Sequence, residues 1–127
     1  ASVTDSTMVR VWWLEDAARD VIRERIAGLG HGHFLSESEK REFGVDFAGR
    51  SYGDDIYLLD AGWQFAPSDM GRTALPGMHG FSPEDGDSDA CFLSNAEPPI
   101  APAWIGDFFR IMTMPKAKGV AGDAAAS

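Results

Sequence analysis

The chain has 127 residues, of which 44% are hydrophobic and 24% are charged. This is the length of one domain, and the apolar content is too high for a wholly disordered polypeptide. Eleven Lys and Arg residues against twenty Asp and Glu residues give a formal net charge of −9. Such a surface repels nucleic acid polymers and anionic lipid, so neither is expected as a partner.

The single cysteine, Cys91, excludes an internal disulfide and a zinc site built from several cysteines. It lies in the apolar run Ala90-Cys91-Phe92-Leu93 and is expected to be a small buried hydrophobe rather than a reactive thiol. No apolar run approaches the roughly 20 residues that cross a membrane, so we expect no membrane partner. The sequence does not indicate the compartment.

The ordered part is expected to run from residue 8 to residue 115, between a frayed polar start (residues 1–7) and a flexible tail (residues 116–127). A β-branched and aromatic run predicts a strand over residues 9–14. A helix ending at Gly30 should follow, because its apolar residues share one face: Ala18, Val21, Ile22, Ile26 and Leu29. Gly30 and Gly32 then predict that the segment from His31 to His33 is a solvent-exposed connector rather than a metal chelate.

Further elements are expected along the rest of the chain. Ser36 and Glu39 have the capping-box spacing, which predicts a short helix over residues 37–43. A strand is expected over residues 55–59, and a hairpin turn at Asp60 should lead into a second strand over residues 63–66. A loop over residues 67–89, a short buried strand over 91–93 and an amphipathic helix over 104–112 should follow. Strands that alternate with helices favour a mixed α/β fold.

The loop over residues 67–89 contains the most informative feature, a histidine (His79) between Gly77 and Gly80. A loop of this length is unusual in a compact domain unless it has a function. A neutral imidazole is a good zinc ligand, and catalytic zinc sites combine histidine with carboxylates. Taken alone, the motif favours a turn histidine over a metal ligand, and both interpretations stay open at this point.

A series of short motifs surrounds this histidine in the order Gly53-Asp54-Asp55-Ile56, Leu58-Leu59-Asp60, Gly62-Trp63, Gly77-x-His79-Gly80-Phe81 and Ala90-x-Phe92. Their order resembles the C-terminal part of the type I phosphodiesterase/nucleotide pyrophosphatase proteins, which belong to the alkaline phosphatase superfamily. The resemblance covers residues 52–112, with a vaguer match over residues 12–43. The chain departs from the family pattern at Ser88, where Met is frequent, and at residues 96–99, where a Gly-Pro-x-Phe turn is usual.

The resemblance implies a mixed α/β partial domain that corresponds to the C-terminal segment of the alkaline phosphatase-like fold. It also implies a zinc-dependent phosphodiesterase or nucleotide pyrophosphatase. In that family the loop histidine binds one of two zinc ions, so His79 is the implied metal ligand. The Thr or Ser nucleophile and the other ligands lie nearer the N-terminus in the family, so no catalytic residue is assigned within this chain.

The implied partners are the N-terminal remainder of the enzyme and a phosphodiester or nucleotide substrate. The chain alone is expected to be inactive and to retain little zinc, because one ligand cannot hold the ion against water. Apolar surface that packs on the remainder of the enzyme should be exposed and could drive self-association.

The rival interpretation is a non-catalytic acidic binding or interaction module, in which His79 is a turn residue on a recognition loop. Residues 85–89 carry alternate carboxylates like the start of a calcium loop, but Ala90 and Ala96 replace the required Gly and Glu, which predicts a solvated acidic turn. The hydroxyls near His79 lack an activating base and are expected to be turn residues: Ser68, Thr73, Ser82 and Ser94.

The carboxylates and tryptophans also have structural interpretations. Asp54 and Asp55 flank a predicted strand and could reach a metal, whereas Asp60 is better explained by the hairpin turn. Trp63 and Phe65 could line a base-stacking pocket, although core packing is the expected role of all the tryptophans: Trp12, Trp13, Trp63 and Trp104.

Overall fold

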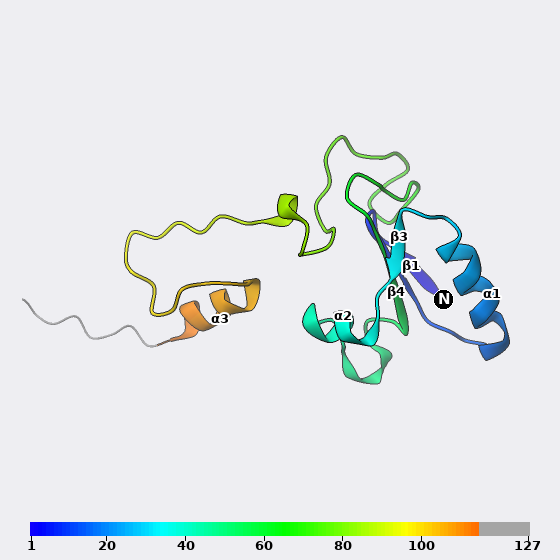
Figure 1. Cartoon of the computed structure of the whole chain (residues 1–127), viewed down its shortest axis with the longest axis horizontal. Helices are drawn as coiled ribbons and strands as arrows, with labels where there is room; N and C mark the ends of the chain where they lie inside the picture. Colours follow the sequence, from blue (N-terminus) through cyan, green and yellow to red (C-terminus); the bar gives the residue numbers. More distant parts are fainter. Residues whose placement is uncertain (115–127) are drawn as a thin grey trace, which may run out of the picture. The chain divides into compact units, whose positions relative to one another are not determined.

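The structure, a computed structural model, describes residues 1–114 and divides the chain into two units, Ala1–Asp89 and a second that begins at Ala90. The expected tail over residues 116–127 lies outside the described residues. Within the described residues the regular elements, drawn in Figure 1, are β1 (Ser2–Thr4), β2 (Met8–Val11), α1 (Asp16–Ala27), β3 (Gly32–Phe34), α2 (Glu37–Glu42), β4 (Asp55–Leu59) and α3 (Ile105–Thr113), with short 3₁₀ helices at Ala48–Arg50 and Gly86–Ser88.

The first unit is built on a four-stranded sheet with the strand order β1-β2-β4-β3, in which every neighbouring pair is antiparallel. Tyr57 lies at the centre of the register, opposite Val9 on β2 and opposite Phe34 on β3. Helix α1 lies on one side of this sheet and α2 on the other (Figure 1). The prediction of a mixed α/β fold is therefore confirmed for the described residues.

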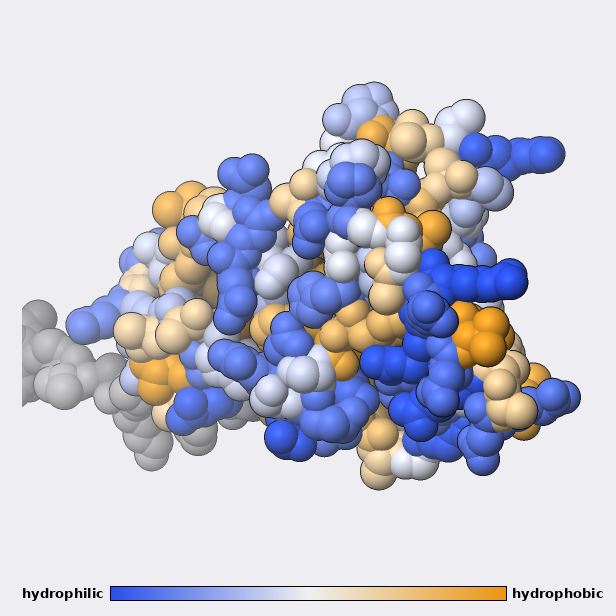
Figure 2. Space-filling model, turned by 45° about the vertical axis from the view of Figure 1, so that its right-hand side comes forward, coloured by the Kyte–Doolittle hydropathy of each residue, from blue (hydrophilic) through white to orange (hydrophobic). Residues whose placement is uncertain are grey.

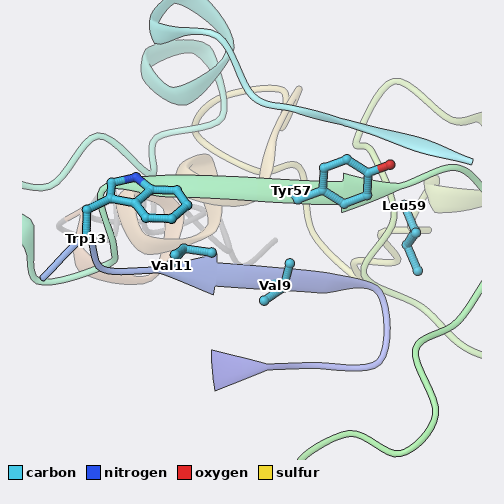
Figure 3. Packing of buried hydrophobic residues seen from close by; sticks show 5 residues of the cluster. All are labelled: Val9, Val11, Trp13, Tyr57 and Leu59. Carbon is cyan, nitrogen blue, oxygen red and sulfur yellow. The ribbon is translucent and has the colours of Figure 1, made fainter. Parts of the chain in front are cut away.

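Both faces of the sheet carry a hydrophobic cluster. On the α1 face, Tyr57 packs with four other buried residues, which Figure 3 shows together: Val9, Val11, Trp13 and Leu59. Ile26 of α1 packs against this cluster. The opposite face buries Leu35, Ile56 and Leu58 under Phe43 and Val45. Because both faces are covered, all five residues of β4 are buried, as in strands at the centre of a two-sided core.

Several predicted elements are confirmed. The strand over residues 55–59 is β4, and the helix that begins after Ser36 is α2. The capping box is present in full, because the Ser36 hydroxyl accepts a hydrogen bond from the Glu39 backbone N–H and the Glu39 carboxylate accepts one from the Ser36 N–H. The two amphipathic helices are α1 and α3, each within a few residues of its expected bounds.

The strand expected over residues 9–14 is shorter and ends at Val11. It ends there because the backbone N–H of Trp13 donates to a side-chain oxygen of Asp54, at 2.6 Å, instead of continuing the ladder.

The expectation of a frayed start over residues 1–7 is wrong. Ser2–Thr4 forms β1, and both Ser6 and Thr7 in the following turn are buried. The reason is backbone pairing with β2, where Ala1 and Trp12 exchange two hydrogen bonds of 2.8 Å and the Asp5 N–H donates to Met8 O. Polar β-branched residues suit such an edge strand, which composition alone did not reveal.

The segment from His31 to His33 is not a connector, because residues 32–34 form β3 and pair with β4. Gly32 has a packing role there. A Cβ atom at this position would lie 2.4 Å from Leu58 O and 2.9 Å from the Tyr57 ring. The glycine therefore permits the close approach of two strands.

Two predicted strands are absent from the described residues. Residues 63–66 follow a turn in which the Trp63 N–H donates to Asp60 O, but the Phe65 N–H then donates to Ser6 O rather than back to β4. Residues 91–93 are exposed and form no strand, so Cys91 is exposed and the prediction of a buried thiol is wrong. No partner strand lies beside them within the described part of the second unit, where α3 is the regular element.

The predicted core role of the tryptophans is confirmed for Trp13 and wrong for Trp63 and Trp104, which are 47% and 62% exposed. The apolar face of α1 is also incompletely covered, since Val21 and Ile22 are 53% and 40% exposed. Figure 2 shows such apolar side chains among charged ones on the molecular surface. Among the described residues, no helix has both the length and the apolar character needed to cross a bilayer.

The capping box of α2 gives a pH prediction. A hydrogen bond from the Ser36 hydroxyl, with further bonds from the Ser36 N–H and His33, lowers the pKa of Glu39 to about 2. A depressed carboxyl pKa stabilises the fold above the unfolded pKa of about 4.3, and this stabilisation is lost as the pH falls toward 2. We expect the side chain of Glu39 to titrate with a midpoint near 2 in an NMR pH series, and Ser36→Ala to raise that midpoint. An ordinary value for Glu39 would contradict the capping box.

Candidate metal-binding loop

The loop that follows β4 is attached to the sheet at several points. The Phe65 N–H donates to Ser6 O and the Asp69 N–H donates to Thr4 O, both at 2.8 Å. Within the loop, the Gln64 side-chain amide donates to Leu75 O at 2.9 Å and accepts from the Leu75 N–H at 3.0 Å. These bonds link the loop to the β1–β2 turn and fold it back on itself, so a segment without regular structure has a defined course.

The last attachment lies next to His79. The hydroxyl of Thr7, a buried residue, donates to Gly80 O at 2.8 Å. Gly80 has φ +92°, and a Cβ atom there would lie 3.1 Å from that hydroxyl. The positive φ angle therefore favours glycine at this position, and the close approach of the Thr7 hydroxyl leaves little room for a side chain. Gly77 is different, since a Cβ atom there would meet nothing within 4 Å.

His79 itself is solvent-exposed, one residue from this attachment. Within residues 1–114 its ring makes no hydrogen bond or ion pair, so both ring nitrogens face no competing protein partner. The described residues contain no group of three or more His, Cys, Asp or Glu side chains that could hold a metal ion. A site at His79 therefore needs its other ligands from outside these residues.

The other two histidines are engaged within the fold. The ring of His31 stacks on the indole of Trp63, with centroids 3.5 Å apart and planes inclined by 11°. This stack covers one face of the indole and leaves less room for the base-stacking role considered for Trp63. His33 Nε2 lies 2.9 Å from a carboxylate oxygen of Glu39. The two histidines therefore lie in different contacts and do not form a chelate.

The strand-flanking carboxylates are occupied by cations. Asp54 forms a two-point ion pair with the Arg50 guanidinium, and hydrogen bonding to Arg50 holds the pKa of Asp54 below its ordinary value. Asp55 is buried and lies 2.6 Å from both Arg23 Nη1 and the Trp13 indole N–H. Burial acts to raise the pKa of Asp55, but these two partners outweigh it and lower the pKa. Neither carboxylate is free to bind a metal.

The remaining candidates behave as predicted turn residues. The hydroxyls of Ser68, Ser82 and Ser94 each accept a hydrogen bond from the backbone N–H two residues further on, and Thr73 is exposed. Asp85 accepts a bond from the Asp87 N–H at the start of a 3₁₀ helix, as expected for a solvated acidic turn. Asp60 lies in the predicted turn.

Thr7 and Gln64, which hold the loop, were not identified by sequence reasoning. Their bonds join residues far apart along the chain, and no local spacing marks them. Family models, characterised proteins and solved structures were also compared with the chain, and none matches it.

Proposed function

We propose that this chain is the C-terminal segment of a zinc-dependent phosphodiesterase or nucleotide pyrophosphatase-like hydrolase, to which it supplies one zinc ligand, His79. The observation that supports this proposal is the presentation of the imidazole. It is exposed, it has no partner within residues 1–114, and it lies next to a glycine fixed by Thr7. The order of motifs around the loop supports the same family. We also propose that the first unit corresponds to the C-terminal segment of the alkaline phosphatase-like fold.

The donor set in the described residues fits this role only in part. One neutral imidazole is a suitable zinc ligand, but catalytic zinc sites use about three protein ligands, so the remaining ligands must come from the rest of the enzyme. Bound zinc in such a hydrolase activates a hydroxyl nucleophile and stabilises charge on the phosphoryl oxygens. The contribution of this chain is positional: the Thr7–Gly80 bond fixes the backbone one residue after His79, from which the imidazole projects.

The test uses the natural polypeptide that contains residues 1–127, with zinc content and hydrolysis of a chromogenic phosphodiester as readouts. His79→Ala is expected to remove about one zinc ion per chain and to lower hydrolysis by about 100-fold or more, since loss of even a supporting residue of a metal site costs about 10–100-fold. His33→Ala is the matched control, because His33 is also exposed but its ring nitrogen contacts the Glu39 carboxylate. It should leave both readouts unchanged.

Full zinc content and full activity in the His79→Ala protein would overturn the proposal. The absence of zinc and of hydrolysis in the wild-type polypeptide would also overturn it and would favour the acidic interaction module. For the isolated chain of 127 residues we expect no turnover with added zinc.

A further inference from the structure

Thr7 lies where the loop after β4 both starts and returns to the sheet. Its backbone carbonyl accepts a hydrogen bond of 2.9 Å from the N–H of Leu59, the last residue of β4. Its side-chain hydroxyl donates to Gly80 O at 2.8 Å. One buried residue is therefore bonded to both ends of the loop over residues 60–80. Joining the ends of a loop removes conformations that an open loop would sample.

The hydroxyl bond is isolated along the loop. The preceding contact is at Leu75, whose backbone is bonded to the side chain of Gln64. Within the described residues, the Thr7–Gly80 bond is the one hydrogen bond that links residues 76–89 to the rest of the first unit. The backbone that carries His79 is thus hydrogen-bonded to the sheet through a single side chain.

Ser6, the neighbour of Thr7 in the β1–β2 turn, also contacts the loop, but its hydroxyl is not alone there. This hydroxyl lies 3.2 Å from the hydroxyl of Ser68. The same part of the loop is bonded to the sheet through the backbone N–H groups of Phe65 and Asp69. Loss of the Ser6 hydroxyl leaves both backbone bonds in place. The two hydroxyls belong to residues that are equally buried, each 3% exposed, but only that of Thr7 is a sole attachment.

We infer that Thr7 is a positioning residue for the imidazole of His79, and that its hydroxyl raises the zinc affinity of the natural polypeptide. This inference rests on the proposed function, since it concerns the same metal ligand. The bond restricts the backbone from which the imidazole projects. Part of the entropy cost of ordering the ligand is therefore met on folding rather than on metal binding. Thr7 acts through Gly80 and not by contact with the metal.

Thr7→Val and Thr7→Ser separate the hydroxyl from the rest of the side chain. Valine has the shape of threonine without the donor, and Gly80 is exposed, so its carbonyl can bond to water and the fold should persist. The zinc affinity of the natural polypeptide, measured by competition with a chelator, should fall by about threefold to tenfold in Thr7→Val, the equivalent of one hydrogen bond. Thr7→Ser keeps the donor and should restore the affinity.

A second measurement needs no metal. In the full chain of 127 residues without zinc, the backbone order parameters of His79 and Gly80 from ¹⁵N relaxation should be about 0.85 in wild type and should fall toward about 0.6 in Thr7→Val. Thr7→Ser should restore them. Ser6→Ala is the matched control, because it removes an equally buried hydroxyl from the same turn and should leave both order parameters unchanged.

Gly80→Ala tests the same bond from its other end. Gly80 has φ +92°, and a Cβ atom there would lie 3.1 Å from the Thr7 hydroxyl, so alanine should displace the carbonyl from its donor. Zinc affinity should fall at least as far as in Thr7→Val. Because both changes break one bond, adding Thr7→Val to Gly80→Ala should lower the affinity by less than about twofold further. Fully additive losses would contradict a shared bond.

Order parameters of His79 and Gly80 that stay unchanged in Thr7→Val would overturn the inference, whatever the zinc affinity. Unchanged zinc affinity in Thr7→Val would also overturn it if the wild-type polypeptide binds zinc through His79. A wild-type polypeptide that binds no zinc would be a failure of the proposed function and of the zinc part of the inference. The order parameters would then still decide whether Thr7 positions the loop.

Discussion

Tyr57→Ala is expected to destabilise the first unit by about 3–5 kcal/mol, the usual cost of removing a large aromatic side chain from a core. Tyr57 has no exposed surface. Its ring meets Phe34 edge to face with centroids 5.1 Å apart, and its hydroxyl donates to Gly30 O at 3.1 Å. Because natural domains have only about 5–15 kcal/mol of stability in total, this variant should be close to unfolding at room temperature.

Urea denaturation followed by tryptophan fluorescence measures this loss. Tyr57→Phe is the matched control, because it removes only the hydroxyl and keeps the ring in the core. Its cost should be about 0.5–1.5 kcal/mol, the net value of one hydrogen bond. A loss of less than about 1 kcal/mol in Tyr57→Ala would contradict the central position of this ring between β2 and β3.

Asp55→Ala is expected to cost about 2–4 kcal/mol, because it leaves the buried indole N–H of Trp13 without an acceptor and separates Arg23 from its carboxylate. Arg23 keeps 35% of its side-chain surface exposed, so water compensates part of its loss, which places the estimate below that for a fully buried ion pair. Equilibrium unfolding in urea at neutral pH gives the value.

The loss should also depend on pH. The pKa of Asp55 is lowered in the folded protein, so its stabilisation is present above the unfolded pKa of about 3.9 and disappears as the pH falls below it. The stability difference between wild type and Asp55→Ala should therefore shrink in acid. Asp60→Ala, a change in the exposed turn just after β4, should stay within about 0.5 kcal/mol at every pH. A pH-independent difference for Asp55→Ala would show that packing alone is lost.

Local signals in the sequence predicted the elements that depend on local chemistry. The capping box placed the start of α2, since both of its hydrogen bonds join residues three apart. The apolar run of β4 gave the bounds of that strand, because its two neighbouring strands and the two clusters bury every residue. The long loop was also predicted, as was the role of its serines in turns.

Elements that depend on distant partners were not predictable in this way. The run Ser2–Thr4 forms a strand because β2 lies beside it. Gly32 suggests a flexible connector in the sequence, but its role is to allow the close approach of β4. The sequence of residues 63–66 predicts the second strand of a hairpin, but the Phe65 N–H donates to Ser6 O in the β1–β2 turn instead of pairing with β4. For the candidate site, the sequence identified His79 and Gly80 but not Thr7, because the Thr7–Gly80 bond spans 73 residues.

The bonds that attach the histidine loop to the sheet all lie within the first unit, since Thr4, Ser6 and Thr7 bond to Asp69, Phe65 and Gly80 respectively. Replacement or deletion of everything after Asp89 would leave each of these bonds in place. The segment that begins at Ala90 could thus be exchanged for another without changing the hydrogen bonds that hold the backbone around His79.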